Sequence, residues 1–412
     1  MKGSGNAWIL CGTGIIWKIC GGKIVPHGNS GKTIRLSKSC LSQEEKEAVI
    51  GVLDREFLGM GTEVQRFEEE LSHYFGRPAL CVVNGTAALH LALQSAGIGV
   101  GDEVLVPSLT YVASFQAIAA CGARPVSCDV LPHTLTIDWR DAERRLTERT
   151  RAVMPVHYAG GVGDLDGVFL FAGHHGLRVV EDAAHAFGSR YRDRLIGGFG
   201  DVTCFSFDGI KNITSGEGGC LVSEDRQLLQ HVQDSRLLGV ERDTERRFAG
   251  ERSWEFDVSI QGWRYHMSNL MAAIGLRQLH RREFLASIRQ ARAERYRQLL
   301  APHGGIGLLE QDYGAIVPHI FPIVLPRNID RDRLRHNLQA MGIQTGVHYQ
   351  PNHWLTMFKD HQADPLPVTD AIAKRLLSLP LHPDLTEEDV DYVCASLIDA
   401  IRRAGCLDDN PS

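Results

Sequence analysis

The chain has 412 residues, of which 43% are hydrophobic and 23% charged, and these values are typical of a soluble globular protein with room for two domains. Its formal net charge is −6, and acidic and basic residues alternate without a basic stripe of the kind that binds nucleic acid. The mildly apolar stretch 7–16 is too short to cross a bilayer. We therefore expect a small-molecule partner, no nucleic acid and no membrane association.

The ten cysteines are scattered along the chain without a CxxC pair, and several lie in apolar, strand-like runs. This usage is typical of reduced thiols and predicts a cytoplasmic protein. Residues 1–33 show no regular pattern and are predicted to form an irregular N-terminal extension. The run 27–33 resembles the end of a P-loop, but Pro26 stands where the first glycine is required, which argues against a nucleotide loop.

Predicted strands and helices alternate through the middle of the chain. Short apolar runs predict strands at 79–83, 103–106, 125–129, 152–156, 178–181 and 202–207. Predicted helices lie between them, at 86–96, 114–121 and about 165–175. This alternation predicts a mostly parallel sheet with helices on both faces, in which ligands bind at the carboxyl ends of the strands. We assign a large α/β domain to residues 34–285 and a small C-terminal domain to residues 286–412.

Two predictions concern the C-terminal part. The segment 269–299 is predicted to be one long helix that leads into the small domain. The segment 319–325 is predicted to be an edge strand, because Pro322 has no N–H to donate to a neighbouring strand.

The strand ends carry the residues with the most informative chemistry. After the first strand, Asn84, Gly85 and Thr86 open a helix, and the free N–H groups there predict a phosphate-binding site, although an ordinary strand-to-helix turn has the same sequence pattern. After the second strand comes Tyr111, which either stacks on a flat heterocycle or packs in the core.

The strand 178–181 is followed by Asp182 and His185. A carboxylate at this position can pair with a protonated ring nitrogen, and His185 can reach a neighbouring hydroxyl group, while Asp182 could also serve only as a helix cap. The strand 202–207 is followed by Lys211, in a loop rich in small residues. A lysine acts as a nucleophile only when its amine is partly desolvated, and otherwise it is a solvated surface charge.

Together these strand ends provide a phosphate site, an aromatic ring, an acid and an amine, which is the set that pyridoxal 5′-phosphate requires. The segments that carry them resemble the DegT/DnrJ/EryC1/StrS family of sugar aminotransferases over about residues 34–403. The resemblance lies in six ordered blocks: Asn84–Leu91, Pro107–Tyr111, Glu181–Gly188, Ser206–Gly219, Arg264–Asn269 and Ser378–Pro383. It implies the fold type I (aspartate-aminotransferase-like) architecture, a pyridoxal 5′-phosphate cofactor and a homodimer with shared active sites.

The resemblance also implies roles for individual residues. Lys211 matches the family's Schiff-base lysine, Asp182 the partner of the pyridine nitrogen, and His185 the residue near the cofactor's 3-hydroxyl group. The remaining cofactor contacts that it implies are the stacking ring of Tyr111 and the phosphate contacts of Gly85, Thr86 and Ser206.

One block departs from the family pattern. The family commonly has Gly-x-Asn-x-Arg-Met-Ser here, and its asparagine contacts the cofactor phosphate of the neighbouring subunit. This chain has Arg264 at the position of that asparagine. A guanidinium suits a phosphate well, so Arg264 either replaces the asparagine or forms an interface salt bridge. The resemblance places His348 and Tyr349 near the nucleotide-sugar pocket, with plain packing as the alternative. The spacing of the histidines in this segment fits no metal site.

The function that follows is transfer of an amino group from L-glutamate to a nucleotide-linked keto sugar, with Lys211 as the general base. We expect the product at C4 of a 4-keto-6-deoxy sugar, with transfer to C3 as the alternative, for O-antigen, other cell-surface polysaccharide or glycosylated natural products. Related sugar dehydratases carry histidine at the lysine position, so Lys211 argues against that reaction. A non-enzymatic regulatory protein of the same fold is the remaining alternative.

Overall fold

The computed structural model describes residues 33–251, 254–361 and 364–404, together with three short strands nearer the N-terminus. These strands, β1 (Trp8–Leu10), β2 (Ile16–Cys20) and β3 (Lys23–Pro26), pair as an antiparallel sheet within the segment that the sequence predicts to be irregular. The rest of that segment, up to residue 32, lies outside the described residues. The P-loop-like run 27–33 therefore also lies outside them, except for Thr33.

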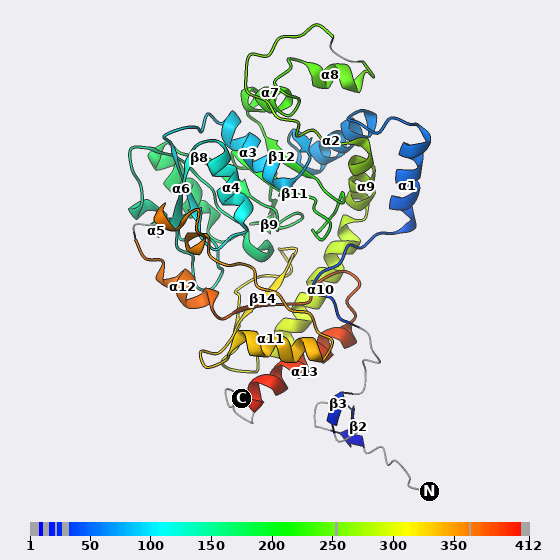
Figure 1. Cartoon of the computed structure of the whole chain (residues 1–412), viewed down its shortest axis with the longest axis vertical. Helices are drawn as coiled ribbons and strands as arrows, with labels where there is room; N and C mark the ends of the chain where they lie inside the picture. Colours follow the sequence, from blue (N-terminus) through cyan, green and yellow to red (C-terminus); the bar gives the residue numbers. More distant parts are fainter. Residues whose placement is uncertain are drawn as a thin grey trace.

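The larger part of the protein, the upper part in Figure 1, contains a seven-stranded sheet. Its strands have the order β4-β12-β11-β8-β7-β5-β6. Only β12 runs antiparallel to its neighbours, so the predicted mostly parallel sheet is confirmed. The strands are β4 (Ala79–Val82), β5 (Glu103–Pro107), β6 (Arg124–Cys128), β7 (Thr150–Val153), β8 (Arg178–Asp182), β11 (Val202–Ser206) and β12 (Gly219–Ser223).

Alternate residues of each strand face different helical layers, because side chains in a strand point to opposite faces. In β4, Cys81 packs in a core with helices α2 and α9, whereas Leu80 and Val82 pack in a second core with α3, α4 and α7. The helices around the sheet are α1 (Gln43–Asp54), α2 (Thr62–Phe75), α3 (Gly85–Ser95), α4 (Val112–Ala120), α5 (Trp139–Arg144), α6 (Leu165–His175), α7 (Arg226–Ser235), α8 (Asp243–Phe248) and α9 (Asn269–His280). A two-stranded ribbon, β9 (Arg190–Tyr191) and β10 (Arg194–Leu195), lies outside the sheet.

The predicted long helix is in fact two helices, α9 and α10 (Arg282–Leu300). They separate at Arg281, whose ψ of 2° breaks the helical ladder and whose guanidinium donates to Glu45 of α1. Helix α10 then runs from the sheet-bearing part to the part that contains β14, α11 and α13 (Figure 1). Leu285 belongs to the first core and Ala293 to the core of the C-terminal part; the domain division after residue 285 remains a proposal.

The C-terminal part contains a three-stranded sheet in the order β13-β14-β15, so the predicted edge position of Pro322 is wrong. Pro322 lies in the central strand opposite Ser378, and the backbone N–H and C=O of Ser378 bond Gly346 on the other side. The carbonyl oxygen of Ser378 thus points away from Pro322 and already accepts a hydrogen bond. Pro322 can therefore lack an N–H without leaving an acceptor of β15 unpaired. The elements here are β13 (Gly307–Leu308), β14 (Phe321–Val324), α11 (Arg331–Ala340), α12 (Pro367–Ala373), β15 (Leu376–Leu379) and α13 (Glu387–Arg403).

No helix among the described residues combines the length and the apolar character that a bilayer crossing requires.

A buried ion pair fastens β4 to its helical layer. The carboxylate of Glu68 in α2 accepts from the guanidinium of Arg236, which is fully buried, and from the backbone N–H of Cys81 at 2.7 Å. Arg236 also donates to the carbonyl oxygen of Cys81 at 2.8 Å. Both polar backbone groups of Cys81 are thereby satisfied, three residues before Asn84, where the chain reaches the site described below.

We expect Glu68→Ala to lower the free energy of unfolding by about 3 kcal/mol, because it leaves the Arg236 cation buried without a counterion. Urea denaturation followed by circular dichroism measures this change. Glu69→Ala, which removes an exposed carboxylate from the next position of the same helix, is the control and should change stability by less than about 0.5 kcal/mol. Equal effects of the two substitutions would contradict the prediction.

Candidate active site

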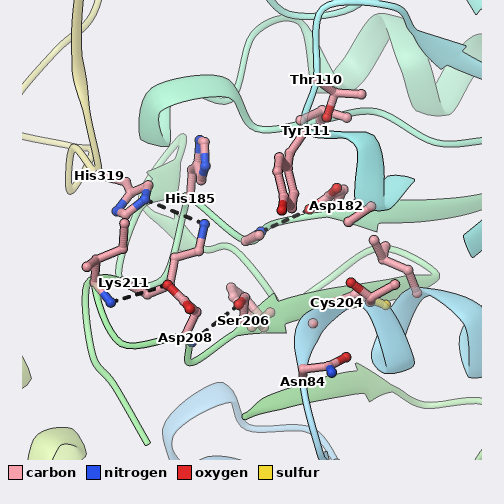
Figure 2. Close-up of a pocket in the computed structure, with 18 of the residues that line it drawn as sticks. Asn84, Thr110, Tyr111, Asp182, His185, Cys204, Ser206, Asp208, Lys211 and His319 are labelled. Carbon is pink, nitrogen blue, oxygen red and sulfur yellow. Dashed lines mark hydrogen bonds between the residues drawn. The ribbon is translucent and has the colours of Figure 1, made fainter. Parts of the chain in front are cut away.

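The carboxyl ends of β4, β5, β8 and β11 meet around one cavity of about 400 Å³ (Figure 2). The residues that line it come from these strand ends, from the β11–β12 loop and from the C-terminal part. They include all of the predicted site residues except Arg264: Gly85, Thr86, Tyr111, Asp182, His185, Ser206, Lys211, His348 and Tyr349. The structure therefore brings together residues that are distant in the sequence.

The N-terminus of α3 forms one end of the cavity. Asn84 is its N-cap, and its side-chain oxygen accepts from the N–H of Ala87 at 2.8 Å, while its carbonyl oxygen accepts from the N–H of Ala88. Within the described residues this leaves the N–H groups of Gly85 and Thr86 for a ligand, at the positive end of the helix dipole. A Cβ atom on Gly85 would lie 2.8 Å from the Cβ of Ser206, so only glycine allows β11 to come this close.

Asp182 lies at the end of β8 and is only 6% exposed. Its Oδ2 accepts from the hydroxyl group of Ser114 at 2.7 Å, and its Oδ1 accepts from the N–H of Ala184 at 3.2 Å. Because both oxygens accept hydrogen bonds, the carboxyl group is held in one orientation. Asp182 does not begin a helix in the structure, so the helix-cap alternative does not apply.

Ser114 was not among the residues predicted from the sequence. It lies in the first turn of α4, shortly after Tyr111, and reaches across to β8. A polar residue in the first turn of a mostly apolar helix was the only signal in the sequence, and it does not reveal a partner at the end of another strand.

His185 is buried, and its hydrogen bonds fix the position of its proton. Burial, together with the nearby Lys211, lowers the pKa of His185 well below its usual value, so the ring is neutral. Its Nδ1 lies 3.3 Å from the N–H of Ala159 and accepts from it, so the proton is on Nε2. Nε2 is 3.0 Å from the hydroxyl oxygen of Tyr349 and donates to it. The hydroxyl proton of Tyr349 is therefore available to a ligand.

The predicted contact of His185 with the cofactor's 3-hydroxyl group remains a proposal, because both ring nitrogens already have protein partners in the structure. Tyr349 has an available proton next to the same position. Its neighbour His348 lines the cavity too and shares a hydrogen bond of 2.8 Å with the hydroxyl group of Ser378.

Lys211 is in the loop between β11 and β12 and is not a solvated surface charge. Burial lowers the pKa of its amine to about 8, against the opposing effects of Asp182 and Asp208. The neutral amine, which is the nucleophilic and basic form, is therefore present near neutral pH. Nζ lies 3.5 Å from Nε2 of His319 (Figure 2).

His319 is a second cavity residue that the sequence did not predict. It comes just before β14 and is 4% exposed, and its ring centre lies 4.5 Å from that of His185. Burial is the main cause that lowers the pKa of His319 well below its usual value, and the nearby charge of Lys211 adds to it. This ring is therefore neutral as well. The sequence placed residue 319 in a strand of the C-terminal part and contained no signal that the strand begins at the cavity.

Tyr111 lies over the cavity with 58% of its surface exposed, so the structure excludes a position in the core. Its ring centre is 5.4 Å from that of Tyr349, and the two rings form part of one wall. An exposed aromatic face at a strand end can stack on a planar ligand.

Arg264 does not line the cavity of its own chain. It is exposed and lies beside the end of β4, where the N–H of Val83 donates to the carbonyl oxygen of the next residue, Tyr265, at 2.7 Å. Its predicted contact with the phosphate of a partner's cofactor therefore remains a proposal.

Comparison with known protein families identifies the family to which this chain belongs. Residues 39–398 match the model of the DegT/DnrJ/EryC1/StrS aminotransferase family. The chain belongs to this family. A DegT/DnrJ/EryC1/StrS aminotransferase uses pyridoxal 5′-phosphate and has the fold type I architecture, as the resemblance in the sequence implied.

Individual relatives agree with this assignment. The chain is 36% identical over 374 residues to the spore coat polysaccharide biosynthesis protein SpsC of Bacillus subtilis, covering 88% of this chain and 96% of that protein. Among solved structures it is similar to the sugar aminotransferase Spr1654 of Streptococcus pneumoniae in its PLP form, with a TM-score of 0.84 and 29% identity over 90% of this chain and 99% of the other. It is also similar to PseC of Helicobacter pylori, an aminotransferase of pseudoaminic acid biosynthesis, with a TM-score of 0.83 and 27% identity over 90% and 100% of the two chains.

The residues around the cavity fit this cofactor. A phosphate fits the N–H groups at the start of α3, a protonated ring nitrogen fits the buried carboxylate of Asp182, and an aldehyde fits the desolvated amine of Lys211. The exposed ring of Tyr111 offers a planar face between these groups.

We expect Ser114→Ala to lower kcat/KM about tenfold, because Asp182 loses a hydrogen bond to its charged form. Steady-state kinetics, with cofactor retention after dialysis as a second measurement, tests this expectation. Ser223→Ala removes an equally buried hydroxyl group, bonded to the Asp201 carbonyl oxygen at the opposite end of β12, and should leave kcat/KM unchanged. A similar loss in both variants would show that Ser114 has no specific role.

Proposed function

We propose that this enzyme transfers the amino group of L-glutamate to a nucleotide-linked keto sugar. The observation that carries the proposal is the desolvated amine of Lys211 in the same cavity as the buried carboxylate of Asp182 and the N-terminus of α3. Family membership supports the reaction class, and the names of several relatives, such as Spr1654, support a sugar as the acceptor.

Each group of residues has a separate part in this proposal. Pyridoxal 5′-phosphate, when bound, supplies an electron sink for the carbanion that forms when the donor loses its Cα proton. The neutral amine of Lys211 takes that proton at Nζ and returns it in the second half of the reaction. Asp182, held by Ser114 and Ala184, keeps the ring nitrogen protonated. The N–H groups of Gly85 and Thr86 and the hydroxyl group of Ser206 hold the phosphate.

The acceptor site lies on the side of the C-terminal part. His348 and Tyr349 line the cavity there, and we assign them to sugar recognition. The available hydroxyl proton of Tyr349 suits a hydrogen bond to a sugar oxygen or to the cofactor.

We propose C4 of a 4-keto-6-deoxy sugar as the position that receives the amino group, and a cell-surface polysaccharide such as O-antigen, or a glycosylated natural product, as the destination. SpsC is named for spore coat polysaccharide and PseC for pseudoaminic acid biosynthesis, which supports a role of this kind. The described cysteines are free thiols, and this supports the cytoplasm as the compartment.

A panel of dTDP-, UDP- and GDP-linked keto sugars with L-glutamate tests the proposal, with release of 2-oxoglutarate and the position of the new amino group as measurements. We expect turnover with a 4-keto-6-deoxy sugar and a loss of at least about 1,000-fold in Lys211→Ala, which lacks the base. A product aminated at C3 would contradict the C4 assignment. Absence of turnover with every sugar by a cofactor-loaded protein would contradict the sugar proposal.

We further propose that the active enzyme is a homodimer in which Arg264 of each chain contacts the cofactor phosphate in the partner's site. Arg264 is exposed and absent from its own cavity, which supports this arrangement. A purified mixed dimer of Lys211→Ala and Arg264→Ala chains tests it, because shared sites leave one site with both residues intact. We expect about half of the wild-type activity in the mixed dimer, and far less in either homodimer. Activity no higher than expected from the Arg264→Ala chain alone would show that the sites are not shared.

A further inference from the structure

Arg289 is a buried cation next to the active site that has no part in the chemistry described above. It lies in α10, is 1% exposed, and is among the largest fully buried side chains of the described residues. Burial lowers the pKa of its guanidinium to about 10, and within the described residues no carboxylate forms a salt bridge with it. An unpaired buried charge is costly unless other polar groups compensate it.

Four backbone carbonyl groups provide the compensation. Nη2 donates to the carbonyl oxygens of Ile210 at 3.2 Å and Lys211 at 3.5 Å. Nη1 donates to those of His319 at 3.1 Å and Leu381 at 3.3 Å, and Nε has no partner among the described atoms. The acceptors belong to three segments that are far apart in the sequence: the loop after β11, the residues before β14 and the residues after β15.

Two of these carbonyl groups belong to residues whose side chains contact each other in the cavity, because Nζ of Lys211 lies 3.5 Å from Nε2 of His319. We propose that Arg289 is a positioning residue, whose planar guanidinium holds the backbones of Lys211 and His319 in one arrangement and thereby directs the Lys211 amine toward the reacting atoms. A guanidinium suits this task, because its donors have a fixed planar geometry that a lysine ammonium lacks.

The charge of Arg289 also acts on Lys211. Burial is the main effect that lowers the pKa of the lysine amine, and the Arg289 cation adds a smaller effect in the same direction, while Asp182 and Asp208 oppose both. Among the described residues, the same cavity also contains the neutral rings of His185, His319 and His348 and the side chains of Glu217, Tyr111 and Tyr349. Removal of Arg289 should therefore leave Lys211 more often protonated.

Pulse labelling with isotopic acetic anhydride at a series of pH values, followed by peptide mass spectrometry, measures the neutral fraction of Lys211 in the cofactor-free full-length protein. The exposed Lys46 in the same sample is the internal reference. We expect Arg289→Gln to slow labelling of Lys211 at least about threefold at pH 7, because loss of the nearby cation leaves the amine more often protonated. Arg295→Gln, which removes a cation of the same helix that pairs with Asp391, should leave labelling of Lys211 unchanged.

Arg289→Lys separates geometry from charge. It keeps the cation but not the planar fork, so we expect labelling of Lys211 within about twofold of wild type and a kcat at least about tenfold lower. Unchanged labelling together with a wild-type kcat in a folded Arg289→Gln protein would overturn the proposal. If that variant does not fold, Arg289→Lys decides, and a wild-type kcat there would overturn it. The inference rests on the proposed role of Lys211, but labelling requires no sugar turnover, so a failure of the sugar proposal is distinguishable from a failure of this one.

Discussion

The chemistry of this site depends on how far one amine is removed from water. Lys211 must stay partly neutral near physiological pH, and burial is the main effect that lowers the pKa of its side chain. Burial alone would destabilise the protonated amine further. The carboxylates of Asp182 and Asp208 stabilise this form and so limit the fall in the pKa of Lys211. The cavity walls therefore do more than shape a binding site, because their packing sets the reactivity of the lysine at their centre.

The sheet makes this balance possible. Parallel strands end at a common edge of the sheet. Asp182, Ser206 and the start of α3 are therefore close in space, although they are far apart in the sequence. The C-terminal part then closes the cavity with His319, His348 and Tyr349. Residues from the strand ends thus line one side of the cavity, and residues from the C-terminal part line the other.

Much of this arrangement could be predicted from the sequence, because local patterns specify it. Apolar runs and alternating helices indicate the strands, and the residue directly after a buried strand must lie at the sheet edge, which is why Lys211, Asp182 and Gly85 could be placed in advance. Ser114, His319 and Arg289 could not be found in this way. Each acts through a partner in a distant segment, and a single sequence contains no record of such contacts.

The wrong predictions have similar causes. Pro322 indicates an edge strand only if its nitrogen faces a neighbouring strand, and the register with Ser378 decides that in three dimensions. The helical periodicity of 269–299 continues across Arg281, but a tertiary contact with Glu45 lies at the point where the helix breaks. Local propensity describes each segment correctly and does not specify how segments constrain one another.

The antiparallel strand β12 has a consequence for folding. It pairs with β11 as a local hairpin that carries Lys211 in its loop. Its other neighbour is β4, which is the first strand of this sheet in the sequence, whereas β12 is the last. Lys211 and the N-terminus of α3, which follows β4, therefore come close together only when the non-local pairing of β12 with β4 has formed. A partly folded chain has no complete cofactor site, so cofactor binding is coupled to the finished sheet and stabilises only the native state.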